Sequence, residues 1–141
     1  MNNVMVATDG SDAASRALDT GVELAKAMGG TLSIVTVGNA RRAKEQESFA
    51  QVEGDTADLA ETFARQILSD AERQVQSSGI NARIELLWGD PAQAIIEAAD
   101  RDKVDTIVVG RRGRGRLSGL LLGSVSQKLT SLAPCAVIVV P

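Results

Sequence analysis

The chain has 141 residues, of which 44% are hydrophobic and 23% are charged, and its formal net charge is −3; this length predicts one globular domain over residues 1–141. The absence of histidine excludes Ser-His-Asp and Cys-His catalysis as well as histidine-ligated metal sites. The single cysteine, Cys135, excludes an intrachain disulfide, and because neither a signal peptide nor an apolar run of about 20 residues is evident, we expect a cytoplasmic protein without membrane insertion.

The first half of the chain predicts strands that alternate with helices. Residues 4–8 form a continuous apolar run, typical of a strand buried on both faces. Ser11 is a suitable N-cap for a helix that ends at Gly29. A strand rich in β-branched residues follows over 31–37. Residues 38–54 are polar and rich in charges, and we expect them to form a surface excursion.

The second half continues the alternation. Asp90 followed by Pro91 is an N-cap and first-turn pair that opens a helix reaching Ala99. The other expected elements are a helix over 55–76, a strand over 83–88, a strand over 105–109, a helix over 124–132 and a strand over 135–140. Strands separated by helices pair in parallel through right-handed crossovers. We therefore predict a doubly wound α/β fold, with helices on both faces of a five-stranded parallel sheet.

The stretch after the fourth expected strand is the most unusual part of the sequence. Residues 110–124, GRRGRGRLSGLLLGS, hold five of the 13 glycines, four arginines and no acidic residue. Without them the chain has 15 − 4 = 11 basic residues against 18 acidic ones, a net charge of −7. Glycines let backbone N–H groups approach an anion, and a helix N-terminus attracts phosphate. The segment is therefore either a phosphate-binding loop or a solvated, arginine-rich loop.

Two common phosphate-binding motifs are absent from this segment. It contains no GxxxxGK[ST] sequence. Gly113, Gly115 and Gly119 are spaced one residue too widely for the dinucleotide fingerprint, and they follow the fourth expected strand rather than the first.

A different spacing resembles a known family. Gly110, Gly113, Gly123 and Ser124 follow the pattern G-x2-G-x9-G-S, which is similar to the ATP-binding motif of universal stress proteins at every defined position. The opening VMVATDGSDAASRAL and the closing GSVSQKLTSLAPCAVIVVP also resemble that family, so the resemblance covers essentially the whole chain. It implies a Rossmann-like sheet with strand order 3-2-1-4-5 and an ATP site beyond the carboxyl ends of the strands.

The resemblance also implies which residues contact the nucleotide. Asp9 would lie near the ribose and adenine, Val37 would recognise adenine through its backbone, and Ser124 would hold the phosphates. The expected cofactor-binding residues are Ala7, Thr8, Asp9, Val37, Val109, Gly110, Arg112, Gly113, Gly123, Ser124 and Val125. Mg²⁺ or Mn²⁺ would accompany ATP, bound through its phosphates. No catalytic residue and no protein metal ligand is expected.

Structural alternatives remain for three of the residues near this site. In these alternatives, the only role of Asp9 is to cap a helix, and the only role of Ser124 is to open a capping box with Gln127. We expect the side chain of Trp88 to pack against the protein rather than to stack on adenine.

Three functions are compatible with these patterns. The leading hypothesis is an ATP-binding stress-response or signalling module whose nucleotide state modulates its interaction with an unidentified protein partner. The alternative is a slow metal-dependent ATPase or phosphotransferase, although Asp9 is the only evident carboxylate near the expected site and no histidine can act as a base. Nucleic-acid binding through the arginines is disfavoured by the net negative charge and by the presence of only three aromatic residues.

The last expected strand predicts an assembly. Residues 135–140 form the most continuously apolar segment, and the implied strand order places them at an edge of the sheet. An exposed apolar edge promotes aggregation unless it is covered or paired. We therefore predict a homodimer through residues 135–140, in which two copies pair across a two-fold axis, as the family resemblance also implies. The alternative is a monomer whose own chain covers this edge.

Overall fold

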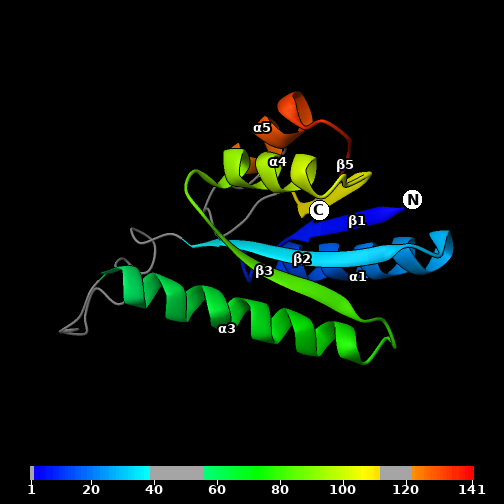
Figure 1. Cartoon of the computed structure of the whole chain (residues 1–141), viewed down its shortest axis with the longest axis horizontal. Coiled ribbons are helices and arrows are strands. Elements are labelled where there is room, and N and C mark those ends of the chain that lie inside the picture. Colours follow the sequence, from blue (N-terminus) through cyan, green and yellow to red (C-terminus); the bar gives the residue numbers. More distant parts are fainter. Residues whose placement is uncertain (1, 39–55, 112–121) are drawn as a thin grey trace.

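The computed structural model describes residues 2–38, 56–111 and 122–141, in which strands and helices alternate along the chain (Figure 1). The strands are β1 (Asn3–Ala7), β2 (Thr31–Gly38), β3 (Ala82–Trp88), β4 (Thr106–Gly110) and β5 (Ala136–Val140). The helices are α1 (Asp12–Met28), α3 (Thr56–Gln76), α4 (Pro91–Arg101) and α5 (Ser124–Leu132).

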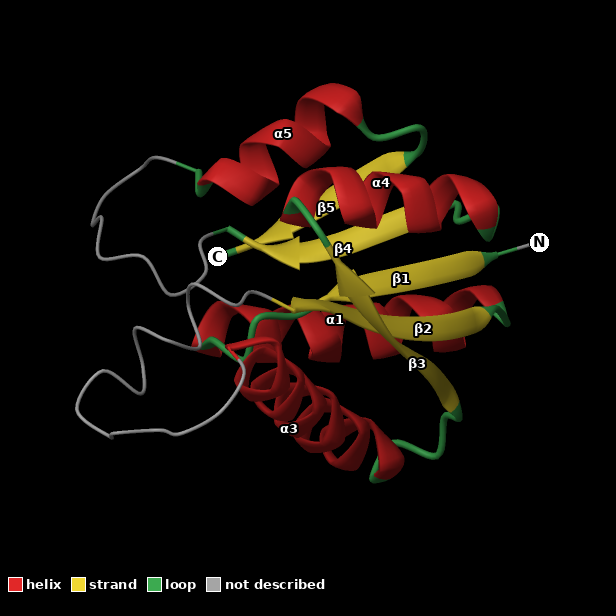
Figure 2. Cartoon of the chain, turned by 60° about the vertical axis from the view of Figure 1, so that its left-hand side comes forward, coloured by secondary structure: helices red, strands yellow, loops and turns green. Residues whose placement is uncertain are grey.

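The strands form one sheet in the order β3-β2-β1-β4-β5, and every neighbouring pair is parallel. Helices α1 and α3 cover one face, and α4 and α5 cover the other (Figures 1 and 2). The predicted α/β fold and its strand order are therefore confirmed. The chain moves outward from β1 to β3 and then returns to place β4 on the other side of β1, so the strand order reverses between β1 and β4.

The central strands are buried on both faces, as their continuous apolar runs predict. Val6 and Ile34 are fully buried in the layer that packs against α1 and α3. Met5, Val35 and Ile107 are fully buried in the layer that packs against α4 and α5. Because successive side chains of a strand point to opposite faces, each central strand contributes to both cores.

The helix ends follow the predicted capping signals. The Ser11 hydroxyl accepts a hydrogen bond from the N–H of Ala14 at 3.2 Å and caps α1. Gly29 ends that helix with a φ of 61°, a left-handed conformation that glycine adopts without a steric penalty. The Asp90 carboxylate accepts from the N–H of Gln93 at 3.1 Å and caps α4. These local signals were therefore sufficient to place the starts of α1 and α4.

Gly38 departs from the prediction, because it was expected to begin a surface excursion. It is instead the last residue of β2, where it pairs in register with Trp88 and is buried. A Cβ at Gly38 would lie only 2.5 Å from an indole carbon of Trp88, so the ring lies directly over this glycine. Trp88 therefore packs on Gly38 with part of its surface and is 49% exposed, so its expected preference for packing over adenine stacking stays a prediction. The rest of the expected excursion, residues 39–54, lies outside the described residues.

The last strand is shorter than predicted at its start. It begins at Ala136, and Cys135 precedes it as a half-buried residue beside the core under α4 and α5. Burial raises the pKa of the Cys135 thiol above its usual range. None of the described helices has the length and hydrophobicity that a membrane crossing requires.

Candidate functional site

The candidate site lies where the strand order reverses, at the carboxyl ends of β1 and β4. Ala7, the last residue of β1, pairs in register with Val35 on one side and with Val109 on the other. Figure 2 shows that α1 and α5 also begin at this end of the sheet. Ligands of doubly wound folds bind beyond the carboxyl ends of the strands at such a reversal. The fold therefore brings the expected site residues of β1, β4 and α5 to one edge.

Thr8 fixes the turn that follows β1. Thr8 is 7% exposed, and its N–H donates to the carbonyl of Val35 at 2.9 Å. Its carbonyl accepts from the hydroxyl of Thr36 at 2.6 Å, and its own hydroxyl accepts from the N–H of Gly10 at 3.2 Å. These bonds hold Thr8 in place through its backbone and its side chain. Thr8 therefore acts as a rigid support for the residue that follows it.

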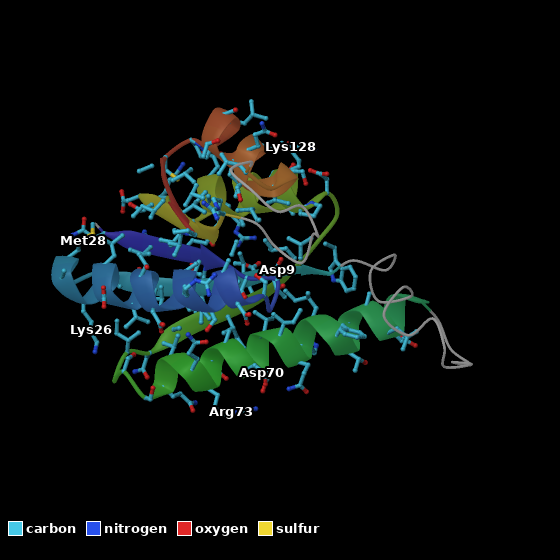
Figure 3. All side chains as sticks on the ribbon, turned by 180° about the vertical axis from the view of Figure 1, so that it is seen from behind. Asp9, Lys26, Met28, Asp70, Arg73 and Lys128 are labelled. Atoms are coloured by element: carbon cyan, nitrogen blue, oxygen red, sulfur yellow. The ribbon has the colours of Figure 1, made fainter. Side chains whose placement is uncertain are left out.

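Asp9 lies beyond the N-terminal end of α1 (Figure 3). One of its carboxylate oxygens accepts from the N–H of Ser11 at 3.0 Å. The N-cap of α1 is Ser11 and not Asp9, so the suggestion that Asp9 serves only as a helix cap is not what the structure shows. The half-buried Asp9 side chain instead closes a short turn at the carboxyl edge of the sheet.

Gly110 ends β4 directly beneath the start of α1. A Cβ at this position would lie 2.9 Å from the Cβ of Ala13 and 3.1 Å from the backbone nitrogen of Ala14. The close approach of helix and strand therefore requires a glycine here whether or not a ligand is present. The resemblance assigned Gly110 to the ligand, whereas the packing of α1 against β4 provides an independent reason for it.

The start of α5 differs from the starts of α1 and α4. Its N-cap is Gly123, which makes no side-chain capping bond, and Ser124 is the first residue of the helix. The alternative that Ser124 opens a capping box is therefore wrong, because a capping-box serine occupies the N-cap position. The first N–H groups of a helix have no carbonyl partner within the helix and carry a partial positive charge. No acidic residue occupies the first turn of α5, so this end is electrostatically suited to an anion.

Two of the remaining predicted residues lie on elements next to the site, and two lie outside the described residues. Val37 is half-buried near the end of β2, and Val125 is half-buried in the first turn of α5. Both pack against the core beneath α4 and α5. Arg112 and Gly113 lie outside the described residues.

Ser126 is a residue that the sequence analysis missed. It is 3% exposed, and its hydroxyl lies 2.8 Å from the carbonyl oxygen of Gly110 and 3.0 Å from that of Arg111. The sequence offered only one signal, a hydroxyl residue two positions after Ser124 on an otherwise apolar helix face. Within the described parts of the chain, no group of three or more acidic or cysteine side chains is arranged to hold a metal ion.

Comparisons with known proteins give a consistent result. A model of the universal stress protein family matches residues 1–141. Universal stress protein YxiE of Bacillus subtilis is 34% identical over 145 residues, which cover 99% of this chain and 98% of that protein. A universal stress protein solved in complex with cAMP has a TM-score of 0.74 and 27% identity, covering 99% of this chain and 97% of that one. The universal stress protein of Archaeoglobus fulgidus solved in complex with dAMP has a TM-score of 0.75 and 25% identity, covering 100% and 98%.

Proposed function

Because the chain belongs to the universal stress protein family, we propose that it is a stress-response protein that binds ATP at the carboxyl edge of its sheet. The main support is the start of α5, which lacks a side-chain cap and follows the strand at the point of order reversal. The complete G-x2-G-x9-G-S spacing that ends at Ser124 also supports phosphate binding there. Two similar proteins hold cAMP and dAMP, which makes an adenine nucleotide the natural ligand class.

The proposed contacts follow from the placement of each residue. The N–H groups of Ser124 and Val125 would bind the phosphates, together with the Ser124 hydroxyl, which is exposed in the first turn of α5. Asp9 would contact the ribose, and the backbone of Val37 would bind the adenine. Mg²⁺ or Mn²⁺ would be held by the phosphate oxygens, which divalent ions commonly bridge.

Equilibrium dialysis with ATP and Mg²⁺ tests this proposal directly. We expect saturable binding at micromolar to millimolar ATP, and weaker binding of ATP after the metal is removed with a chelator. Binding of AMP should change little on metal removal, because a metal ion mainly bridges the β- and γ-phosphates. Absence of binding at millimolar ATP with Mg²⁺ would contradict the proposal.

We further propose that ATP acts as a signal that modulates binding to a protein partner rather than as a substrate. No histidine is available as a general base, and Asp9 is the one carboxylate of the expected site. Phosphate release from bound ATP is the measurement that separates these functions. Turnover faster than about 1 s⁻¹, the lower end of typical enzyme rates, would instead establish the alternative, an ATPase or phosphotransferase.

A further inference from the structure

The hydroxyl of Ser126 connects two segments that are distant in the sequence. Ser126 is on the first turn of α5, whereas its two acceptors, the carbonyls of Gly110 and Arg111, are at and just after the end of β4. The side chain is almost completely buried, so these contacts are shielded from water. A buried hydroxyl has one proton, which these two carbonyls share. This side chain therefore joins the end of the strand to the start of the helix.

Backbone hydrogen bonds reinforce the same junction. The N–H of Gly123 donates to the carbonyl of Arg111 at 2.8 Å, and the N–H of Arg111 donates to the carbonyl of Val140 at 2.6 Å. We call Gly110, Arg111, Gly123 and Ser126 the neck. The neck joins the end of β4 to the start of α5, so that the start of α5 has a defined position relative to β4 and β5.

We infer that Ser126 is a positioning residue for phosphate binding, through its hold on the neck; this inference rests on the proposed function. Affinity for an anion depends on N–H groups that are already in place, because a ligand that must order them loses binding free energy in doing so. Ser126 lies two residues after Ser124, on the same helical turn, and its hydroxyl bonds that turn to the end of β4. Without its hydroxyl, the start of α5 loses its side-chain hydrogen bonds to the end of β4 and keeps the backbone bond of Gly123 and the packing of Val125.

Ser126 uses its hydroxyl differently from the threonine that follows it on the same helix. Thr130, one turn later on α5, donates to the carbonyl of Gln127 within its own helix at 2.9 Å. That local bond is the usual arrangement for a helical hydroxyl and ties no distant segments together. Thr130 is also exposed, so Thr130→Ala is a matched control that removes a hydroxyl from the same helix without affecting the neck.

The experiment compares the affinities of ATP and adenosine in four proteins: the wild type, Ser126→Val, Ser126→Thr and Thr130→Ala. Valine and threonine have the same shape, so this pair differs only in the hydroxyl. We expect Ser126→Val to weaken ATP binding about tenfold, equivalent to about 1.4 kcal/mol, and to leave adenosine binding unchanged, because adenosine has no phosphate. Ser126→Thr should restore ATP binding to within about threefold of the wild type, and Thr130→Ala should bind both ligands normally.

A second measurement needs no nucleotide. Amide hydrogen exchange at Gly123 should become faster in Ser126→Val than in the wild type or in Thr130→Ala, because its bond to Arg111 is no longer supported. Wild-type protein that fails to bind ATP would contradict the proposed function, while the exchange rates would still test the neck. Unchanged ATP affinity in folded Ser126→Val, or an equal loss of adenosine affinity, would overturn the positioning role.

Discussion

At the scale of single residues, two glycines of the same motif have different structural environments. Gly110 has no room for a side chain, because a Cβ would lie 3.0 Å from the carbonyl carbon of Ala13. Gly123 has a φ of −65° and a ψ of 161°, an extended conformation that any residue adopts. We therefore expect substitutions at Gly110 to reduce folding stability, and substitutions at Gly123 to act mainly on ligand binding.

The first prediction separates these two effects. Gly123→Val should abolish ATP binding while the free energy of unfolding changes little, because the branched side chain obstructs the phosphates at the helix entry. Gly110→Ala should lower the free energy of unfolding by about 1–3 kcal/mol, the usual cost of overpacking. Urea unfolding followed by fluorescence measures the stability of both variants, because Trp88 is the only tryptophan and the chain has no tyrosine. Equilibrium dialysis measures their ATP binding.

Gly123→Asp provides a further control for the same prediction. An aspartate at the N-cap position bonds the free N–H groups of the helix and stabilises it, but its negative charge repels phosphate. We expect slightly higher stability together with a loss of ATP binding. Normal ATP binding by Gly123→Val or Gly123→Asp would show that the phosphates bind elsewhere.

At the scale of elements, a charged network joins β3 to the C-terminal end of α4. Arg101 pairs with Asp102 at 2.9 Å and with Glu85 on β3, and Arg83 of β3 also pairs with Asp102. The Asp102 carboxylate is 19% exposed, and its hydrogen bond with Arg101 holds its pKa below the usual range. Asn3, at the start of β1, donates to the carbonyl of Asp102 at 3.3 Å. The network therefore attaches the edge strand β3 to the C-terminal end of α4.

The second prediction follows from the lowered pKa of Asp102. The unfolded chain binds a proton at this carboxylate more readily than the folded one, so the contribution of Asp102 to stability is complete above the usual aspartate pKa and is lost as the pH falls through the folded value. Asp102→Asn should lower the free energy of unfolding by about 1 kcal/mol at neutral pH, since the arginines are half exposed and screened by solvent. The difference in the free energy of unfolding between Asp102→Asn and the wild type should become smaller below about pH 4.

Asp70 on α3 is the matched control for this prediction. It pairs with Arg73 at 3.5 Å on the outer face of the helix, and both side chains are more than half exposed (Figure 3). Asp70→Asn should leave stability unchanged at every pH, because exposed ion pairs of this kind contribute little. Urea unfolding between pH 3 and pH 7, about the range over which aspartates titrate, compares the two variants. A pH-independent difference for Asp102→Asn would contradict the role of its charge.

At the scale of the whole molecule, the two edges of the sheet differ in chemistry. The β3 edge carries Arg83 and Glu85, both engaged in ion pairs with the end of α4. The β5 edge, Ala136–Val140, has no charged residue, and its side chains are exposed or half-buried in the single chain. Leu132, at the end of the neighbouring helix, is 64% exposed. Charged side chains discourage strand pairing, so β5 is the edge suited to pair with a second copy.

The third prediction is a homodimer through residues 135–140. Sedimentation should show a dimer for the wild type at micromolar concentration and monomers for Val137→Lys and Val139→Lys, because a buried lysine opposes pairing of the two edges. Ile84→Lys on β3, whose isoleucine is 38% exposed, is the control and should remain dimeric. A monomeric wild type, or lysine variants of β5 that dimerise unchanged, would show that this interface is wrong.

Much of the fold was predictable from the sequence, for a physical reason. Capping bonds connect residues a few positions apart, so Ser11 and Asp90 reveal the starts of their helices directly. Apolar runs and helical spacing likewise reflect burial through local periodicity. The motif that ends at Gly123 and Ser124, and the family that it resembles, could also be identified from the order of residues alone.

Other features were decided only by the tertiary structure, because they join residues that are distant along the chain. Gly38 is a strand residue because it pairs with β3, and the ring of Trp88 lies against it; no neighbour in the sequence predicts either contact. Gly110 is required by the packing of α1, almost a hundred positions earlier. Little in the sequence distinguishes Ser126 from the other serines. Only the approach of α5 to the end of β4 directs its hydroxyl to the carbonyls of the neck.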